Sequence, residues 1–310
     1  MYLRIAEFSL TLNQMKTLVT VVESGSITAA AKRLFVTQAA VSTALAALKS
    51  EVGVELFVRE GRGVRLTEAG ATLYEYAKKI LGLIEEATSV TRGSGGLTKR
   101  ILRIAAVTTA GEVLLPRWLD SYLVIDAEIE IKLEVSNRSR VFDLLESHNV
   151  DLAVCGTPPP NRLLEVKAVR GHKLFLVIGR SRLSSLGETA DVGQMIEILS
   201  RTPWLVREEG SGTRSNSDEL IARLNIEPQL FTLSSNVAIK EACLLGVGVA
   251  LLSIDSVSEE LSDGRLSILE VPTTPIKKIW NVVVRRDEPL NRVAAAFLDH
   301  IVEAAYVERT

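Results

Sequence analysis

Residues 207–221, REEGSGTRSNSDELI, place two glycines, several small hydroxyl residues and an arginine where a helix is expected to begin. The free N–H groups at the start of a helix attract anions, so this segment could hold a negatively charged ligand. An arginine in the first turn is unusual because a cation there opposes the helix dipole. We therefore expect Arg214 to be neutralised by Glu208, by Glu209 or by a bound anion. The segment alone leaves open whether that anion is a substrate, a cofactor or a signal.

Two further segments place polar side chains directly after a predicted strand. Thr108 and Thr109 follow the apolar run 101–107, and Asn137 and Arg138 follow the next predicted strand. Ligands of α/β sheets bind at the carboxyl ends of strands, where helix N-termini point. Simple helix capping by Ser, Thr and Asn would explain any one of these segments, whereas three of them together leave capping and an anion site as balanced alternatives. The sequence contains no GxxxxGK[ST] or GxGxxG pattern, so neither a phosphate loop nor a dinucleotide site is predicted.

Few residues could carry catalysis or bind a metal. The two cysteines, Cys155 and Cys243, have no paired spacing, which excludes a disulfide framework and a cysteine-type zinc site. We interpret Cys155 as a buried small hydrophobic residue, with a redox role as the alternative. The three histidines are scattered, and none lies near the candidate loops. We expect no cofactor and no enzymatic activity, and an α/β enzyme acting on a small anionic substrate stays as the alternative.

The bulk properties describe an ordinary globular chain. At 310 residues, 47% apolar and 24% charged, it is expected to form two or three domains. Residues 1–92 carry 11 Lys/Arg against 9 Asp/Glu, and the remainder carries 25 against 29, so the first part is slightly basic. No apolar run has membrane-spanning length, and the N-terminus lacks a secretion pattern. We expect a cytoplasmic protein without a membrane partner, which disfavours an exported solute-binding protein.

The first part of the chain has the pattern of three short helices. Apolar residues at helical spacing predict one helix that stops at Gly25, a second after Ser26, and a third from Thr37 to Gly53. Thr37 is a favourable N-cap, and Gly53 is a favourable residue just beyond the helix end. A tight turn between the second and third helices is the helix-turn-helix pattern.

A basic hairpin is predicted to follow these helices. The segment VELFVREGRGVRL reads as two short strands around a glycine-rich tip. Arg59, Arg62 and Arg65 lie on or beside it, as expected for a wing that contacts DNA phosphates. A small three-helix domain with a solvated basic hairpin and no DNA is the alternative.

Residues 67–92 are predicted to form one long helix, roughly 39 Å at 1.5 Å per residue. Its apolar residues follow a heptad pattern for three repeats, which favours a dimer seam over packing against its own domain. The predicted seam residues are Leu73, Tyr76, Ile80, Leu83, Ala87 and Val90. The sequence GSGG at 93–96 then ends the helix and predicts a flexible joint. Beyond it, alternating helical and strand patterns predict α/β subdomains with mostly parallel sheets.

The N-terminal motif closely resembles the winged helix-turn-helix of LysR-type transcriptional regulators. The residues that carry the resemblance are Ser26-Ile27-Thr28-Ala29-Ala30-Ala31, Leu34, Thr37-Gln38-Ala39-Ala40-Val41-Ser42, Leu45, Leu48, Val52-Gly53, Leu56-Phe57, Arg59, Arg62 and Thr67-Glu68-Ala69-Gly70. The family often has proline in place of Ala39 and basic residues later in the third helix, so this recognition helix is poor in charge. Base reading would fall to Gln38, Ser42 and Thr43. The expected DNA contacts are Thr28, Thr37, Gln38, Ser42, Thr43, Arg59, Arg62 and Arg65.

The remainder is similar to the effector domain of the same family, which resembles the two-lobed periplasmic solute-binding fold. The resemblance implies a winged helix-turn-helix DNA-binding domain at 1–66, a linker (dimerisation) helix at 67–92, a hinge at 93–100, and an effector-binding domain at 101–310 with two Rossmann-like lobes, lobe I at 101–177 plus 277–310 and lobe II at 178–276. The Gly-Ser-Gly-Thr-Arg form is common in members that sense small anions. The expected effector contacts are Thr108, Thr109, Asn137, Arg138, Ser211, Gly212, Thr213 and Arg214.

The resemblance also implies a function. The chain is expected to bind double-stranded promoter DNA, with a small anionic metabolite between the lobes modulating that binding. It would form a homodimer through the linker helix and a homotetramer through its effector domains. Effector identity and the choice between activation and repression are left open.

Overall fold

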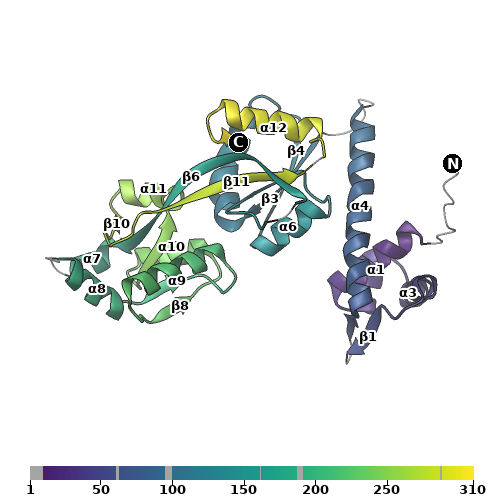
Figure 1. The fold of residues 1–310 in the computed structure, drawn as a ribbon, viewed down its shortest axis with the longest axis horizontal. Helices are drawn as coiled ribbons and strands as arrows, with labels where there is room; N and C mark the ends of the chain where they lie inside the picture. The colour runs from purple at the N-terminus through teal and green to yellow at the C-terminus, as the bar shows by residue number, and fades with distance from the viewer. Residues whose placement is uncertain (1–9, 61–62, 95–99, 161, 187–190, 287) are drawn as a thin grey trace. The chain divides into compact units, whose positions relative to one another are not determined.

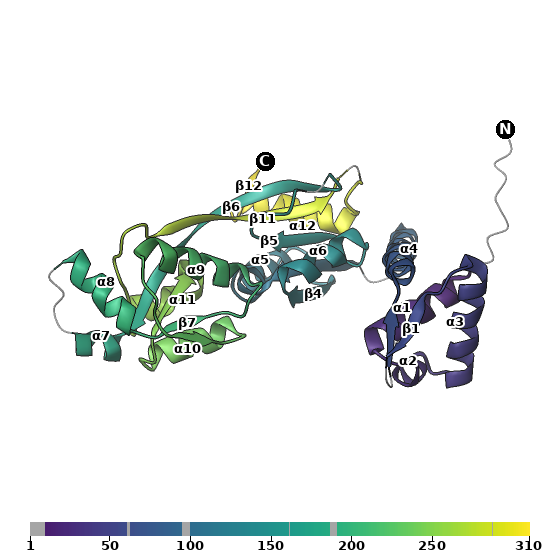
Figure 2. The same ribbon diagram turned by 60° about the horizontal axis from the view of Figure 1, so that its bottom comes forward.

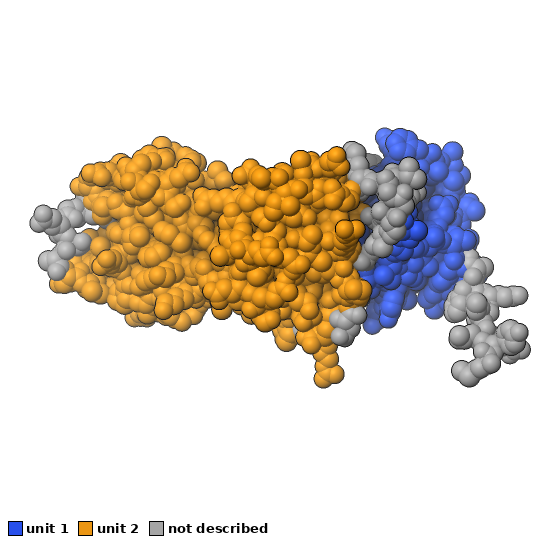
Figure 3. All heavy atoms as spheres, turned by 90° about the horizontal axis from the view of Figure 1, so that it is seen from above, with its two compact units in different colours: residues 1–98, 146–149 blue, residues 99–145, 150–310 orange. Residues whose placement is uncertain are grey.

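The computed structural model describes residues 10–60, 63–94, 100–160, 162–186, 191–286 and 288–310. The chain divides into two compact units, which Figure 3 colours separately: residues 1–98 with 146–149, and residues 99–145 with 150–310. We call them the DNA-binding unit and the effector unit after the expectations stated above. Within the described ranges, no helix combines the length and the apolar character needed to cross a membrane.

The DNA-binding unit contains the three predicted short helices, the wing and the long helix. The elements are α1 (Leu12–Ser24), α2 (Ile27–Leu34), α3 (Gln38–Val52), β1 (Phe57–Glu60), β2 (Gly63–Leu66) and α4 (Glu68–Ser94). Local signals set the helix ends: the Thr37 hydroxyl accepts a hydrogen bond from the Ala40 N–H at 3.1 Å, and Gly25 and Gly53 end their helices in the left-handed conformation. The predicted helix-turn-helix is therefore confirmed.

The wing is a short antiparallel hairpin whose two strands pair from Phe57 opposite Leu66 to Glu60 opposite Gly63. Its tip, residues 61–62, lies outside the described residues. The Thr67 hydroxyl donates to the Glu55 carbonyl at 2.6 Å and accepts from the Gly70 N–H at 2.9 Å. One side chain therefore joins the base of the wing to the first turn of α4.

The predicted seam of helix α4 is divided between two environments. Leu73 and Ile80 are half-buried in the core of the DNA-binding unit, around Leu18 of α1. Tyr76 and Leu83 are exposed, at 62% and 48%. Ala87 is also exposed, and the side chain of Val90 lies outside the described residues. Packing against its own domain therefore accounts for part of the apolar stripe, because α1 covers one face of α4, as Figure 1 shows.

The effector unit is built on one ten-stranded sheet in the order β4-β3-β5-β11-β6-β9-β7-β8, with β10 and β12 also paired to β6. Its strands are β3 (Ile101–Val107), β4 (Glu130–Ser136), β5 (Leu152–Cys155), β6 (Leu164–Gly179), β7 (Trp204–Val206), β8 (Leu230–Thr232), β9 (Val249–Ser253), β10 (Leu266–Ile268), β11 (Ile276–Arg285) and β12 (Glu308–Arg309). Its helices are η1 (Ala110–Leu114), α5 (Leu115–Leu123), α6 (Arg138–Glu146), α7 (Arg180–Leu186), α8 (Val192–Arg201), α9 (Gly212–Leu224), α10 (Asn236–Leu244), α11 (Ile254–Ser262) and α12 (Arg292–Glu303).

The expectation of mostly parallel sheets is wrong in one respect. Strands β3, β4 and β5 pair in parallel, as do β7, β8 and β9, but β6 and β11 pair antiparallel with each other and with their neighbours. Residues 164–179 form one continuous strand, β6, with Gly171 in its middle. These long strands run side by side through the unit (Figure 2) and lie between the two parallel groups in the sheet.

Each lobe has helices on both faces of its part of the sheet. In the first lobe, α5 and α12 cover one face and α6 the other, because successive residues such as Ile104 and Ala105 point to opposite faces. In the second lobe, α8 and α9 cover one face and α10 and α11 the other. Along β6, Ala168 packs in the first core and Leu174 in the second. The chain therefore crosses between lobes within 168–174, upstream of the expected boundary at residue 177.

A glycine allows the close approach of β9 to the start of β7. A Cβ atom on Gly248 would clash with the backbone carbonyl oxygen of Pro203, whereas one on Gly171 would meet no atom within 4 Å. We expect Gly248→Ala to lower the free energy of unfolding of the effector unit by about 1–3 kcal/mol, because backbone atoms must move. Urea denaturation followed by circular dichroism measures this. Gly171→Ala is the matched control, and equal destabilisation by both variants would contradict the steric argument.

Candidate functional site

A cavity of about 290 Å³ lies between the two lobes of the effector unit. It is bounded by the ends of β3, β4 and β5, by the crossing strands β6 and β11, and by the starts of α6, α9 and α10. Most of the polar groups that line it are hydroxyls and amides. They are Thr108, Thr109, Ser136, Asn137, Thr157, Ser211, Thr213, Ser215, Asn216, Asn236, Ser253 and Ser256.

The structure brings together seven of the eight expected effector contacts. These are Thr108, Thr109, Asn137 and Arg138 from the first lobe and Ser211, Gly212 and Thr213 from the second. These residues meet because all three polar segments follow strands whose carboxyl ends lie at the junction of the lobes. Arg214 is the exception, because it does not line the cavity.

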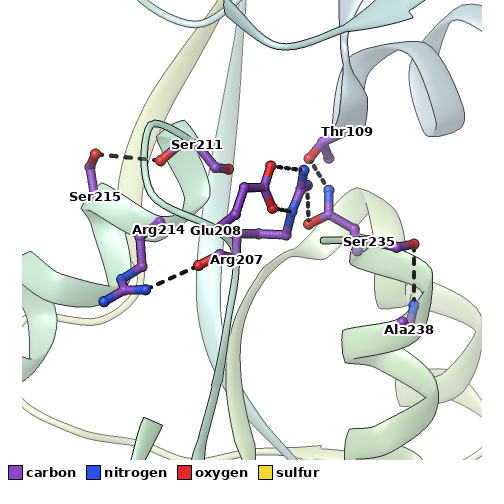
Figure 4. Close-up of polar contacts among 9 residues, drawn as sticks. Thr109, Arg207, Glu208, Ser211, Arg214, Ser215, Ser235 and Ala238 are labelled. Carbon is purple, nitrogen blue, oxygen red and sulfur yellow. Dashed lines mark hydrogen bonds and ion pairs between the residues drawn. The ribbon is translucent and has the colours of Figure 1, made fainter. Parts of the chain in front are cut away.

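Arg214 extends away from the cluster around Thr109 and Glu208 (Figure 4). Its Nε lies 2.7 Å from Oδ1 of Asp218, and its Nη1 donates to the Arg207 carbonyl at 3.2 Å. The expectation that Glu208 or Glu209 neutralises Arg214 is therefore wrong, because Asp218 forms the ion pair with it. Asp218 lies four residues later on the same helix face, so a local ion pair offsets the unfavourable charge in the first turn.

A second arginine lines the cavity besides Arg138: Arg207, which was not among the expected effector contacts. It is 5% exposed. Its Nε and Nη2 donate to the two carboxylate oxygens of Glu208, each at 2.8 Å, and its Nη1 donates to Oδ1 of Asn236 at 3.0 Å. The available signal was its position directly after strand β7, at the carboxyl end of a strand.

Polar contacts through Arg207 join the two lobes. The Asn236 amide, at the start of α10 in the second lobe, donates to the Thr109 hydroxyl of the first lobe at 2.9 Å. Glu208, Arg207, Asn236 and Thr109 thus form one connected series. Figure 4 labels three of its members, Glu208, Arg207 and Thr109. A ligand that changes the partners of Arg207 would change a contact that holds the lobes together.

The three helix starts around the cavity differ in how their N–H groups are used. Asn137 caps α6 by accepting from the Arg140 N–H at 3.0 Å, and Ser235 caps α10 by accepting from the Ala238 N–H at 3.4 Å. The capping residue of α9, Ser211, makes no side-chain cap hydrogen bond. The first N–H groups of α9 are therefore left for a partner in the cavity, as an anion site at a helix start needs.

The charge of the lining favours an anion. Among the described residues that line the cavity, Arg138, Arg207 and Lys278 are cationic and Glu208 carries the only carboxylate. Its hydrogen bonds from Arg207 hold the pKa of Glu208 below its usual value, so this carboxylate is ionised at neutral pH. Burial lowers the pKa of His172 to about 4, so its ring is neutral there. The charges of the lining at neutral pH thus sum to +2.

Other titratable groups of the unit fit structural roles. The His172 ring stacks on Trp280 at a centroid distance of 4.3 Å, on the crossing strands. Cys155 and Cys243 are buried, and burial raises the pKa of both thiols to about 12. Both thiols therefore stay protonated at neutral pH, in agreement with the interpretation of Cys155 as a small hydrophobic residue.

In the DNA-binding unit, the residues expected to read bases lie on an exposed surface. Thr28 on α2 and Gln38, Ser42 and Thr43 on α3 are exposed. Thr37 is exposed as well, although its hydroxyl already caps α3.

The wing arginines are described only in part. Arg65 on β2 is exposed, Arg59 lies in β1 with its side chain outside the described residues, and Arg62 lies outside them altogether. Sequence reasoning missed Phe35, which is 95% exposed in the left-handed turn between α2 and α3. Its backbone is left-handed, with a φ of 57°, because Phe35 is the residue that ends α2.

Two family models match the chain. Residues 12–71 match the bacterial regulatory helix-turn-helix protein, lysR family, and residues 95–305 match the LysR substrate binding domain. The chain is similar to the HTH-type transcriptional activator CmpR of Synechocystis sp., with 32% identity over 295 residues that cover 94% of each chain.

Solved structures share the fold. The LysR family transcriptional regulator CbnR aligns with a TM-score of 0.69 at 20% identity, covering 96% of this chain and 99% of the other. The regulatory domain of Synechocystis CcmR in complex with 2-PG aligns with a TM-score of 0.58 at 27% identity, covering 66% and 97%. With both of its domain types matched in order, the chain belongs to the LysR family of bacterial transcriptional regulators.

Proposed function

We propose that this regulator binds a small anion in the cavity between its lobes and that the anion changes its binding to promoter DNA. The observation that carries the proposal is the buried guanidinium of Arg207 beside the uncapped start of α9. Charge-assisted hydrogen bonds from an arginine and a helix start together favour a carboxylate or phosphate group. The cavity of about 290 Å³ suits a metabolite of few atoms. The complex of the similar CcmR domain with 2-PG supports the same ligand class.

The anion would act by favouring one arrangement of the lobes. It can contact Thr108 and Thr109 on one side and Ser211 and Thr213 on the other. A ligand that interacts differently with two arrangements shifts the population toward the one it binds better. No cofactor other than this anion enters the proposal, and its role is that of a signal, not a substrate.

The DNA contacts are proposed to come from α2, α3 and the wing of two paired chains. Exposed Tyr76, Leu83 and Ala87 on α4 provide apolar surface for a homodimer, and effector units would pair the dimers into a homotetramer in the cytoplasm. Two recognition helices one turn of duplex apart would then read a dyad-like site. The exposed face of α3 presents the Gln38 amide, the Ser42 hydroxyl and the methyl groups of small side chains to DNA. Base recognition would therefore depend on amide and hydroxyl contacts.

Arg207→Gln is expected to weaken anion binding about 10- to 100-fold, because a buried charge-assisted contact to the ligand is lost. Isothermal titration of the full chain with 2-PG and with inorganic phosphate measures this. Arg214→Gln is the matched control and should bind within about twofold of wild type, because Arg214 pairs with Asp218 outside the cavity. A loss in Arg214→Gln with none in Arg207→Gln would refute the assignment.

Gln38→Ala is expected to reduce the discrimination between operator and unrelated DNA by about 1–3 kcal/mol, because a bidentate base contact is removed. Gel-shift titrations against both DNA types measure the ratio. Asn13→Ala, also exposed but on α1, should leave it unchanged. Equal weakening on both DNA types by Gln38→Ala would mean that Gln38 contacts the backbone and not a base.

A further inference from the structure

The cavity lining includes one carboxylate, that of Glu208, and this carboxylate pairs with Arg207, the most buried cation of the lining. Both oxygens of the Glu208 carboxylate accept from Arg207, at 2.8 Å each, which is the bidentate geometry that an arginine offers to a bound carboxylate or phosphate. The two residues are neighbours in sequence, and neighbours in a strand point to opposite faces. The pair can form because strand β7 ends at Val206, one residue before Arg207.

The two partners of this ion pair differ in their access to water. The Arg207 side chain is 6% exposed, whereas the Glu208 side chain is 41% exposed. A buried guanidinium cannot lose its counter-charge without a large desolvation cost. A carboxylate that is 41% exposed keeps part of its hydration in the ion pair, so Glu208 can turn into water at a lower cost than the guanidinium can. Exchange at this site therefore means that Glu208 leaves and another anion arrives.

We propose that Glu208 is a built-in competitor of the effector, occupying the two Arg207 N–H groups that the ligand's anionic group takes. This rests on the proposed function, an anion bound at Arg207. The carboxylate stands in for the ligand while the cavity is empty, so Arg207 keeps a partner in both states. Only an anion that interacts with Arg207 better than one tethered carboxylate displaces it. This favours phosphates and ligands with two anionic groups over simple monocarboxylates.

The exchange also reaches the contact between the lobes. The third donor of the same guanidinium, Nη1, holds the Asn236 carbonyl oxygen, and the Asn236 amide holds the Thr109 hydroxyl of the first lobe. When the bidentate partner of Arg207 changes from a tethered carboxylate to a free ligand, the guanidinium is no longer fixed to the backbone at residue 208. The position of Asn236, and with it the hydrogen bond from Asn236 to Thr109, then depends on the ligand.

The test is isothermal titration of the full chain with 2-PG and with inorganic phosphate. Glu208→Gln and Glu208→Ala are expected to bind the anion about tenfold more tightly than wild type. This gain corresponds to a wild-type chain in which Glu208 leaves Arg207 free in about one-tenth of the molecules. Glu208→Gln removes the charge but keeps an oxygen that can accept a hydrogen bond from Arg207, whereas Glu208→Ala removes both. Glu209→Gln removes the same charge one residue away, at an exposed position, and should bind within about twofold of wild type.

The outcomes separate this inference from the proposal it rests on. If wild type binds and neither Glu208 variant binds more tightly, or if Glu209→Gln gains as much, the competition is refuted and the anion site stands. If neither wild type nor the Glu208 variants bind either anion, both the anion site and the competition are refuted. Thermal unfolding of each variant in buffer without added anions confirms that the chain is folded before titration.

Discussion

The effector unit depends on keeping one buried positive charge satisfied. Arg207 lies directly after strand β7, almost without access to water, and a buried charge needs hydrogen-bonded partners. Its carboxylate partner comes from the next residue, its amide partner from the first residue of α10, and its backbone carbonyl is held by the first turn of α9. Strand β7, helix α9 and helix α10 therefore converge on this group.

The crossing strands provide the frame around that charge. Strands β6 and β11 carry side chains of both lobe cores, so each lobe is folded onto the same pair of strands. The irregular register between Val282 and Val283 lies on the first-lobe side, beyond the point where the chain changes lobes. The lobes are thus joined by a hydrogen-bonded ribbon and by the polar series through Asn236. The relative arrangement of the lobes therefore depends on the backbone hydrogen bonds between β6 and β11 and on the side-chain contacts through Asn236, of which only the second can change with a ligand.

The parts of the structure that local signals determine could be predicted from the sequence. Thr37, Gly25 and Gly53 define helix ends because capping needs only a few neighbouring residues. Strand ends could be placed as well, which is why Thr108, Asn137 and Ser211 were correctly expected to meet. The direction of a side chain could not, because Arg207 and Arg214 lie in one polar segment and only the folded chain shows that Arg207 lines the cavity while Asp218 holds Arg214 outside it. The antiparallel crossing was missed for the same reason, since an apolar strand reads alike in either direction.

The three tryptophans of the chain occupy three distinct places. Trp118 is 2% exposed in the core of the first lobe, Trp204 is fully buried in that of the second, and Trp280 lies against His172 at the cavity wall. Each lobe therefore carries an intrinsic fluorophore shielded from solvent, and the third fluorophore lies at the junction. A change of emission confined to the cavity would come from Trp280, whereas loosening of a lobe would be seen in Trp118 or Trp204. Tryptophan fluorescence of the native chain can thus report on both lobes and on the cavity. Replacing each tryptophan singly by phenylalanine would show which residue gives which part of the emission.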